Sequence, residues 1–179
     1  MPRINFISKQ EIVHFELPYN FTHKEQQYFF VLPKKLEKFA LSLESNINII
    51  IFILLYGHFK SNHKFYSLKS FTHQDMDYIC KKYTLHIIDK ELYLNVKTLN
   101  RYKKIITHYF RINDYTQEIK NTLQKEANNL ANNFIHRKKI FYTLIELSKK
   151  LNIEVPSYTE LTRIIIVALN TQKPISFLS

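Results

Sequence analysis

Glycine, cysteine and tryptophan are almost missing from this chain of 179 residues, which has one glycine, one cysteine and no tryptophan. A lone cysteine, Cys80, excludes a disulfide framework and a zinc site built on several cysteines. A lone glycine, Gly57, excludes the glycine-rich loops that cradle phosphates in nucleotide-binding enzymes. The sequence therefore predicts no metal and no cofactor, and it fits a reducing cytoplasm.

Long apolar runs are also missing. The longest one, residues 49–56, is far shorter than the ~20 residues that cross a bilayer. The first five residues lack the apolar region of a signal peptide. We therefore expect no membrane segment, and we interpret residues 46–59 as a buried core helix.

Acidic residues are in the minority, with 15 Asp and Glu against 26 Lys and Arg, a net charge of +11 and a pI near 9.6. Such a balance indicates an anionic partner, which could be DNA, RNA or a membrane surface. The hydrophobic fraction of 45% is that of an ordinary globular protein. A chain of this length can form one sizeable core or two small ones.

Helix signals recur along the whole chain, and strand signals do not. Ser8, Thr22, Thr72 and Ser157 each stand where a capping residue opens an apolar pattern of helical spacing, and residues 113–116 are expected to cap a further long helix. No segment alternates cleanly over five residues, and no hairpin dipeptide occurs. We predict an all-α fold of two small helical subdomains, residues 1–95 and 96–179, each with a helix-turn-helix-like unit.

The clearest such unit is residues 141–169, which read as two amphipathic helices joined by a turn at Asn152 and Ile153. In a helix-turn-helix the leading residues of the second helix enter the major groove of DNA. The base-reading candidates are therefore Ser157, Tyr158, Thr159 and Arg163. An ordinary antiparallel helix pair has the same spacing, and Glu154 and Glu160 would repel phosphate.

A second helix-break-helix pattern covers residues 75–83 and 86–94, and a basic segment follows it. There Thr98 is expected to cap a helix over 98–110, an arrangement that suits phosphate binding. Another basic run, residues 136–139, lies between two expected helices. The phosphate-contact candidates are Arg3, Lys97, Arg101, Lys103, Lys104, Arg137, Lys138 and Lys139, with Asn100 as a further base reader. The alternative is that both basic runs are ordinary solvated surface. If the chain does bind DNA, we expect the phosphate-contact and base-reading candidates to share one outer surface shaped to lie along a duplex.

The sequence gives little support for a catalytic function. The four aspartates, at positions 75, 77, 89 and 114, each stand where a helix cap or a short loop accounts for them. His58 and His63 belong to an expected loop, residues 57–66, with no cysteine or carboxylate close in sequence, so a zinc site is not predicted. We expect a protein that is not an enzyme.

Several short segments follow one another in an order that resembles a known protein family. Residues 1–3 (Met-Pro-Arg) and 6–11 (Phe-Ile-Ser-Lys-Gln-Glu) are followed by a helix that closes near Pro18. The isoleucine-rich segment 50–60, segment 77–85, segment 97–102 (Lys-Thr-Leu-Asn-Arg-Tyr) and segment 144–156 then come in turn. Together they resemble the N-terminal region of the Tn-three family of replicative, cointegrate-forming transposases. Tyr102 departs from the family pattern, in which a histidine is common.

This resemblance implies two helical DNA-binding subdomains that grip the terminal inverted repeat of a transposable element. The family's acidic catalytic triad lies in a C-terminal domain that this sequence does not contain, so the chain should bind and position transposon ends without cutting them. The implied partners are double-stranded DNA and other transposase domains, in the bacterial cytoplasm near the nucleoid. A helical protein-interaction or regulatory module is the alternative, and RNA binding is a third.

Overall fold

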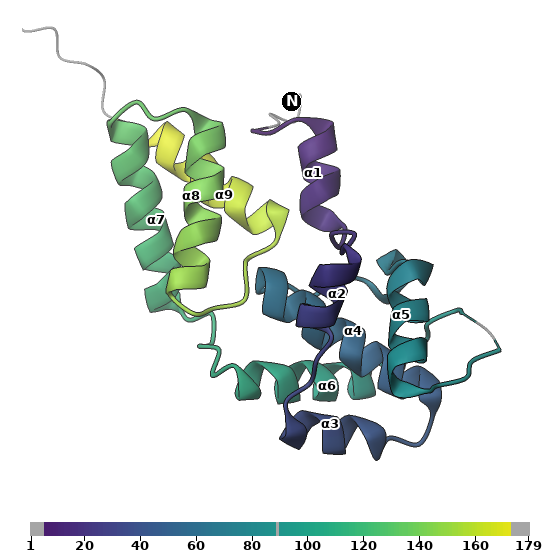
Figure 1. Cartoon of the computed structure of the whole chain (residues 1–179). Coiled ribbons are helices and arrows are strands. Elements are labelled where there is room, and N and C mark those ends of the chain that lie inside the picture. Colours follow the sequence, from purple (N-terminus) through teal and green to yellow (C-terminus); the bar gives the residue numbers. More distant parts are fainter. Residues whose placement is uncertain (1–5, 89, 173–179) are drawn as a thin grey trace, which may run out of the picture. The chain divides into compact units, whose positions relative to one another are not determined.

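The computed structural model describes residues 6–88 and 90–172, and within them the fold is helical throughout, with no β-sheet (Figure 1). This confirms the all-α prediction. The helices are α1 (Lys9–Glu16), α2 (His23–Phe29), α3 (Lys34–Leu41), α4 (Asn46–Asn62), the 3-10 turn η1 (Leu68–Ser70), α5 (His73–Tyr83), α6 (Val96–Tyr109), α7 (Gln117–Asn132), α8 (Arg137–Lys150) and α9 (Tyr158–Asn170).

The chain divides into two compact units. Unit 1 is formed by Met1–Val13 with Ile112–Ser179, and unit 2 is His14–Arg111. The division expected after residue 95 therefore differs from the observed one, because α6 packs against α4 and so belongs to unit 2. Each unit is described by itself.

Unit 2 is built around α4, as expected for the isoleucine-rich segment. Every side chain from Ile49 to Phe59 is buried, and α2, α3, α5 and α6 all contact this helix. A helix that is apolar around its whole circumference needs neighbours on every side. The four surrounding helices provide them, and α4 is the core of the unit.

Gly57 explains how closely α2 and α4 approach each other. A Cβ atom at this position would lie 2.4 Å from Cδ1 of Phe30, a fully buried ring. The expected loop over residues 57–66 was wrong in its first half, because α4 continues to Asn62 and ends at His63, which adopts a left-handed φ of 52°. His58 is consequently inside the core.

The helix expected over residues 86–94 is not formed. Thr84 ends α5 with a φ of 54°, and the backbone N–H of Leu85 donates to the carbonyl of Cys80. Among the described residues of this segment only Leu92 is buried, while Ile88 and Tyr93 are exposed. Without an apolar stripe to bury, a helix here would gain little from packing. The predicted helix-turn-helix of the first subdomain is therefore wrong for these segments.

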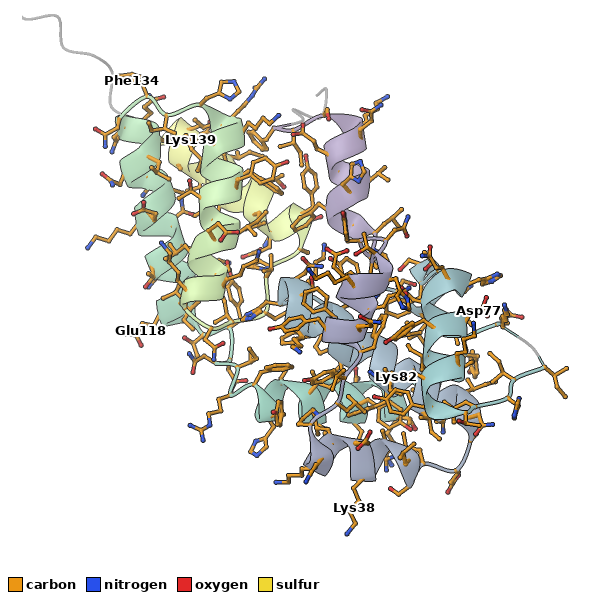
Figure 2. All side chains as sticks on the ribbon, in the orientation of Figure 1. Lys38, Asp77, Lys82, Glu118, Phe134 and Lys139 are labelled. Carbon is orange, nitrogen blue, oxygen red and sulfur yellow. The ribbon has the colours of Figure 1, made fainter. Side chains whose placement is uncertain are left out.

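Unit 1 contains a three-helix cluster in which α7, α8 and α9 contact one another (Figure 1). Its core is made of aliphatic and aromatic side chains at helical spacing: Leu123, Ala127, Ala131, Ile140, Phe141, Leu144, Leu161, Ile164, Ile165 and Ala168. The two C-terminal helices are confirmed, and residues 151–157 connect them. Phe134 lies beyond the end of α7 and is 62% exposed (Figure 2).

Candidate nucleic-acid interface

The charged side chains of helix α6 are all positive. It carries Lys97, Arg101, Lys103 and Lys104 and no carboxylate. The cap of α6 is Asn95, whose Oδ1 accepts a hydrogen bond from the Thr98 N–H at 2.8 Å. The expected cap at Thr98 was therefore wrong, because Asn95 fills that role one turn earlier.

Lys97, Arg101 and Lys104 of α6 line a groove shared with α3. Its volume is about 1040 Å³, and its basic lining consists of Lys35, Lys97, Arg101, Lys104 and His108. Thr98 and Asn100 also line it, and no carboxylate does. Tyr102 and Ile106 hold α6 against the core, and their spacing turns the cations away from it. Five predicted site residues, Lys97, Thr98, Asn100, Arg101 and Lys104, thus meet in one place.

Lys103 lies elsewhere. Its Nζ is 5.3 Å from the ring centroid of Phe65, and its side chain is half-buried. Two residues after Arg101 on a helix, Lys103 points away from the groove because neighbouring positions face different directions. Among the described residues of α6, it is the cation that does not line the groove.

Lys35 and His108 complete the groove, and sequence reasoning did not include them. They lie on α3, whose Lys34, Lys35 and Lys38 are exposed, and near the end of α6. Figure 2 shows Lys38 extending outward from α3. The sequence offered no signal that α3 adjoins α6, because the two helices are more than fifty residues apart in the chain.

In unit 1, the leading turn of α9 is capped as predicted, with the Glu160 N–H donating to Ser157 Oγ at 3.2 Å. The Glu160 carboxylate binds the side chains of Lys120, Arg163 and Tyr115, at 3.2, 3.0 and 3.3 Å. Burial and then Glu160 raise the pKa of Tyr115 to about 12. Arg163 keeps 62% of its side chain exposed while it makes this ion pair.

The predicted base readers of α9 differ in their surroundings. Tyr158 is half-buried, and its ring centroid is 5.7 Å from that of Phe141, so the ring takes part in packing. Ser157 and Thr159 are exposed. The contact with Phe141 places the first turn of α9 beside the second turn of α8.

The basic run before residue 140 begins α8, where the Lys138 N–H donates to His136 Nδ1 at 3.3 Å. Arg137 and Lys139 are exposed, and Figure 2 labels Lys139. Lys138 Nζ lies 2.6 Å from Oε1 of Glu11, and this contact is the largest cause of a Glu11 pKa of about 2, below its usual 4.5. The same carboxylate raises the pKa of Lys138. Arg3 lies outside the described residues.

Sequence reasoning missed a buried polar group in unit 2. The Asp75 carboxylate accepts a 2.8 Å hydrogen bond from Gln26 Nε2, and His58 Nε2 lies 3.2 Å from its other oxygen. All three side chains are almost fully buried, so this group links α2, α4 and α5. Within the described residues, no three His, Cys, Asp or Glu side chains are placed to hold a metal ion.

None of the described helices is both long enough and apolar enough to span a membrane.

The sequence was also compared with known proteins. Neither the curated proteins nor the solved structures include a significant match to this sequence. One family model, "Domain of unknown function (DUF4158)", matches residues 6–168. Because this match covers most of its length, the chain belongs to the DUF4158 family.

Proposed function

We propose that this chain binds double-stranded DNA through the groove between α3 and α6. The observation that carries the proposal is the joint lining of that groove by Lys35, Lys97, Arg101 and Lys104 without any carboxylate. Like charges held close together repel one another, and a polyanion relieves that repulsion while it releases its own counterions.

The dimensions of α6 suit this role. A helix of 14 residues is about 21 Å long at about 1.5 Å per residue. One DNA strand carries a phosphate about every 3.4 Å along the duplex axis. The helix therefore lies opposite about six phosphates, and its exposed cations can contact several of them together.

Unit 1 supplies a second set of contacts in this proposal. Arg137 and Lys139 are exposed at the start of α8 and would contact phosphates, while Ser157, Thr159 and Arg163 would read bases from the first turns of α9. Lys138 is paired with Glu11, and the Tyr158 ring packs against Phe141, so both residues would contribute less to DNA binding. Base contacts from the start of a helix are the usual way in which a helix-turn-helix selects its sequence.

The resemblance to the Tn-three family of transposases supports a more specific target, the terminal inverted repeat of a transposable element. In this proposal the chain positions transposon ends and does not itself cut DNA. The test is a gel shift that compares the inverted repeat of the parent element with random DNA at ~150 mM salt, where non-specific binding is weak. Equal affinity for the two would exclude sequence-specific binding.

A matched pair of variants tests the groove itself. Lys97→Ala with Lys104→Ala removes two cations from the groove, while Lys24→Ala with Lys69→Ala removes two exposed cations of unit 2 outside it. The net charge falls equally in both. We expect a loss of DNA affinity of about tenfold or more for the groove variant alone. Equal losses would show that binding depends only on overall charge.

A protein-interaction module is the second candidate. It is favoured by the exposure of Ile166 and Val167, neighbouring apolar side chains on α9 that are 42% and 43% exposed. Association with a protein partner that does not weaken with salt, together with no DNA binding at low salt, would favour this candidate over the first.

A further inference from the structure

The groove between α3 and α6 decides where helix α6 would lie on a duplex. Its walls include Thr98, Ile105 and Tyr109 of α6 and Lys35 and Leu36 of α3. If a phosphate backbone lies in this groove, α6 lies beside that backbone, in one of the two grooves of the DNA. An α-helix enters the major groove, which is about 12 Å wide, and not the minor groove, which is about 6 Å wide. This placement of α6 in the major groove rests on the proposed function.

The side of α6 that faces away from α3 would then meet the edges of the base pairs. Successive residues turn by about 100° around a helix axis, so Asn100 lies about 140° from Ile105, and Val96 about 180° from it. Tyr102 and Ile106 face the core, while Val96 and Asn100 are exposed. Val96 and Asn100, one turn apart, are therefore neighbours on the side away from α3. Asn100 also lines the groove, so one turn of α6 can reach both a phosphate backbone and the adjoining bases.

The side chain of Asn100 is available for a base contact. It is exposed and makes no hydrogen bond to any residue that the structure describes. A carboxamide combines an N–H donor with a C=O acceptor, and adenine presents the matching acceptor and donor, N7 and the N6 amino group, in the major groove. Lys97 and Lys104 lie on α6 one turn before and one turn after Asn100. Their ammonium groups only donate, so they suit the phosphates on either side of that base.

Val96 is a second, independent observation on the same side of α6. It is the first residue of the helix and is 72% exposed, although its side chain is apolar. The methyl group of thymine is the apolar group that base pairs present in the major groove, and apolar side chains recognise it. The Cβ atoms of residues one turn apart on a helix are about 5–6 Å apart. Val96 and Asn100 can therefore reach the same base pair or two neighbouring ones.

We propose that α6 is a recognition helix, in which Asn100 hydrogen-bonds to N7 and N6 of an adenine and Val96 contacts the methyl group of a thymine. Lys97 and Lys104 contact the flanking phosphates. Unit 2 then selects A·T base pairs by itself, in addition to any bases that α9 reads in unit 1. Both readers belong to the first two turns of α6, and the start of a helix is where recognition helices usually contact bases.

The test begins with a selection from duplexes with a randomised centre, carried out with the full chain and with Asn100→Ala. We expect the unaltered chain to enrich an adenine at one position, and Asn100→Ala to lose that preference alone. In the selected duplex, 7-deazaadenine at this position removes only N7 and should weaken binding of the unaltered chain about fivefold, but not binding of Asn100→Ala. Lys97→Ala is the control, and it should weaken binding to all duplexes without changing the selected sequence.

Uracil in place of a thymine tests Val96 in the same duplex. The change removes one methyl group and should weaken binding of the unaltered chain about threefold when made at the thymine that Val96 contacts. Val96→Ala should bind the two duplexes equally. Because Asn100 and Val96 are exposed, and because alanine favours the helix, we expect both variants to fold as the unaltered chain does.

The outcomes separate this inference from the proposed function. If Asn100→Ala selects the same adenine, or if 7-deazaadenine weakens the variant and the unaltered chain equally, recognition by Asn100 is overturned while DNA binding in the groove stands. Duplex binding without enrichment of any adenine has the same consequence. A uracil effect that persists in Val96→Ala overturns the contact with the thymine methyl group. No binding to any duplex overturns both proposals.

Discussion

Lys138 Nζ lies 2.6 Å from Glu11 Oε1, so the ammonium group in the first turn of α8 is bound to a carboxylate of α1. Tyr142, one turn further along α8, donates to the same oxygen at 3.1 Å. Within unit 1 these contacts join residues that are more than one hundred positions apart. They would also make Lys138 less available to the DNA that we propose as a partner.

The Glu11 contact predicts a dependence of stability on acid. The pKa of Glu11 falls to about 2 in the folded protein from the usual 4.5, so its contribution to stability is complete above pH 4.5 and is lost as the pH falls through about 2. Urea unfolding of Glu11→Gln should show lower stability than the unaltered chain at neutral pH, and the difference should disappear in strong acid. As a control, Glu146→Gln alters an exposed pair with Lys149 and should have little effect. A Glu11→Gln difference that is independent of pH would contradict the assignment.

Gly57→Ala should destabilise unit 2 by about 1–3 kcal/mol, since overpacking a dense core has costs of this order. The added methyl group would lie 2.4 Å from the Phe30 ring, which cannot move freely because it is fully buried. Chemical denaturation measures the change. Ser61→Ala, on the same helix and only half-buried, is the control and should leave stability nearly unchanged. Adding Phe30→Leu should recover part of the loss at Gly57, and no recovery would argue against the steric explanation.

Asp75→Ala should lower the free energy of unfolding of unit 2 by about 3 kcal/mol or more, at least as much as Gly57→Ala. The substitution leaves Gln26 Nε2 and His58 Nε2 buried without their acceptor, and each such group costs about 1–3 kcal/mol. The matched control is Asp77→Asn, because the Asp77 carboxylate is 59% exposed and pairs with Lys90 at the surface. Exposed pairs contribute at most about 1 kcal/mol. Similar unfolding midpoints for the two variants would show that the buried group does not stabilise the unit.

Arg101→Ala should weaken binding to all DNA sequences and lower the slope of log K against log salt by about 0.9, the value for one phosphate contact on a duplex. Lys103→Ala removes the same charge from the same helix, but from a side chain that lies near Phe65. Its slope should match that of the unaltered chain. Fluorescence anisotropy over a range of salt concentrations measures both, and equal changes would place the duplex outside the groove.

Thr159→Ala should change the preference among bases at one position of the target by about 1–3 kcal/mol, with little effect on the salt slope. Thr159 is exposed in the first turn of α9, so its loss should not disturb the core. Competition binding with singly substituted duplexes measures the effect. A uniform loss of affinity across all of them would indicate a phosphate contact and not a base contact.

Most helix starts could be predicted from the sequence because a cap is a local interaction. Thr22, Thr72 and Ser157 each accept a hydrogen bond from a backbone N–H three residues later, which requires only neighbouring residues. The same reasoning failed over residues 86–94, where spacing alone suggested a helix. Helices of this length are marginal unless packing supports them, and the short pattern there could not reveal that its side chains remain exposed.

The candidate site was predictable only in part, and for the same reason. The basic segment of α6 was visible as a run of cations, yet only the fold shows that Arg101 faces a groove and that Lys103 does not. Lys35 joins the groove from α3, and Asp75, an expected helix residue near a cap, meets His58 in the core. The residues alone determined the helical class, the apolar central helix and the excess of positive charge, since these follow from local hydrogen bonds, side-chain period and composition. Which charges are neighbours was decided by tertiary packing, because contacts between distant segments depend on how the helices pack around α4 and not on any one stretch of sequence.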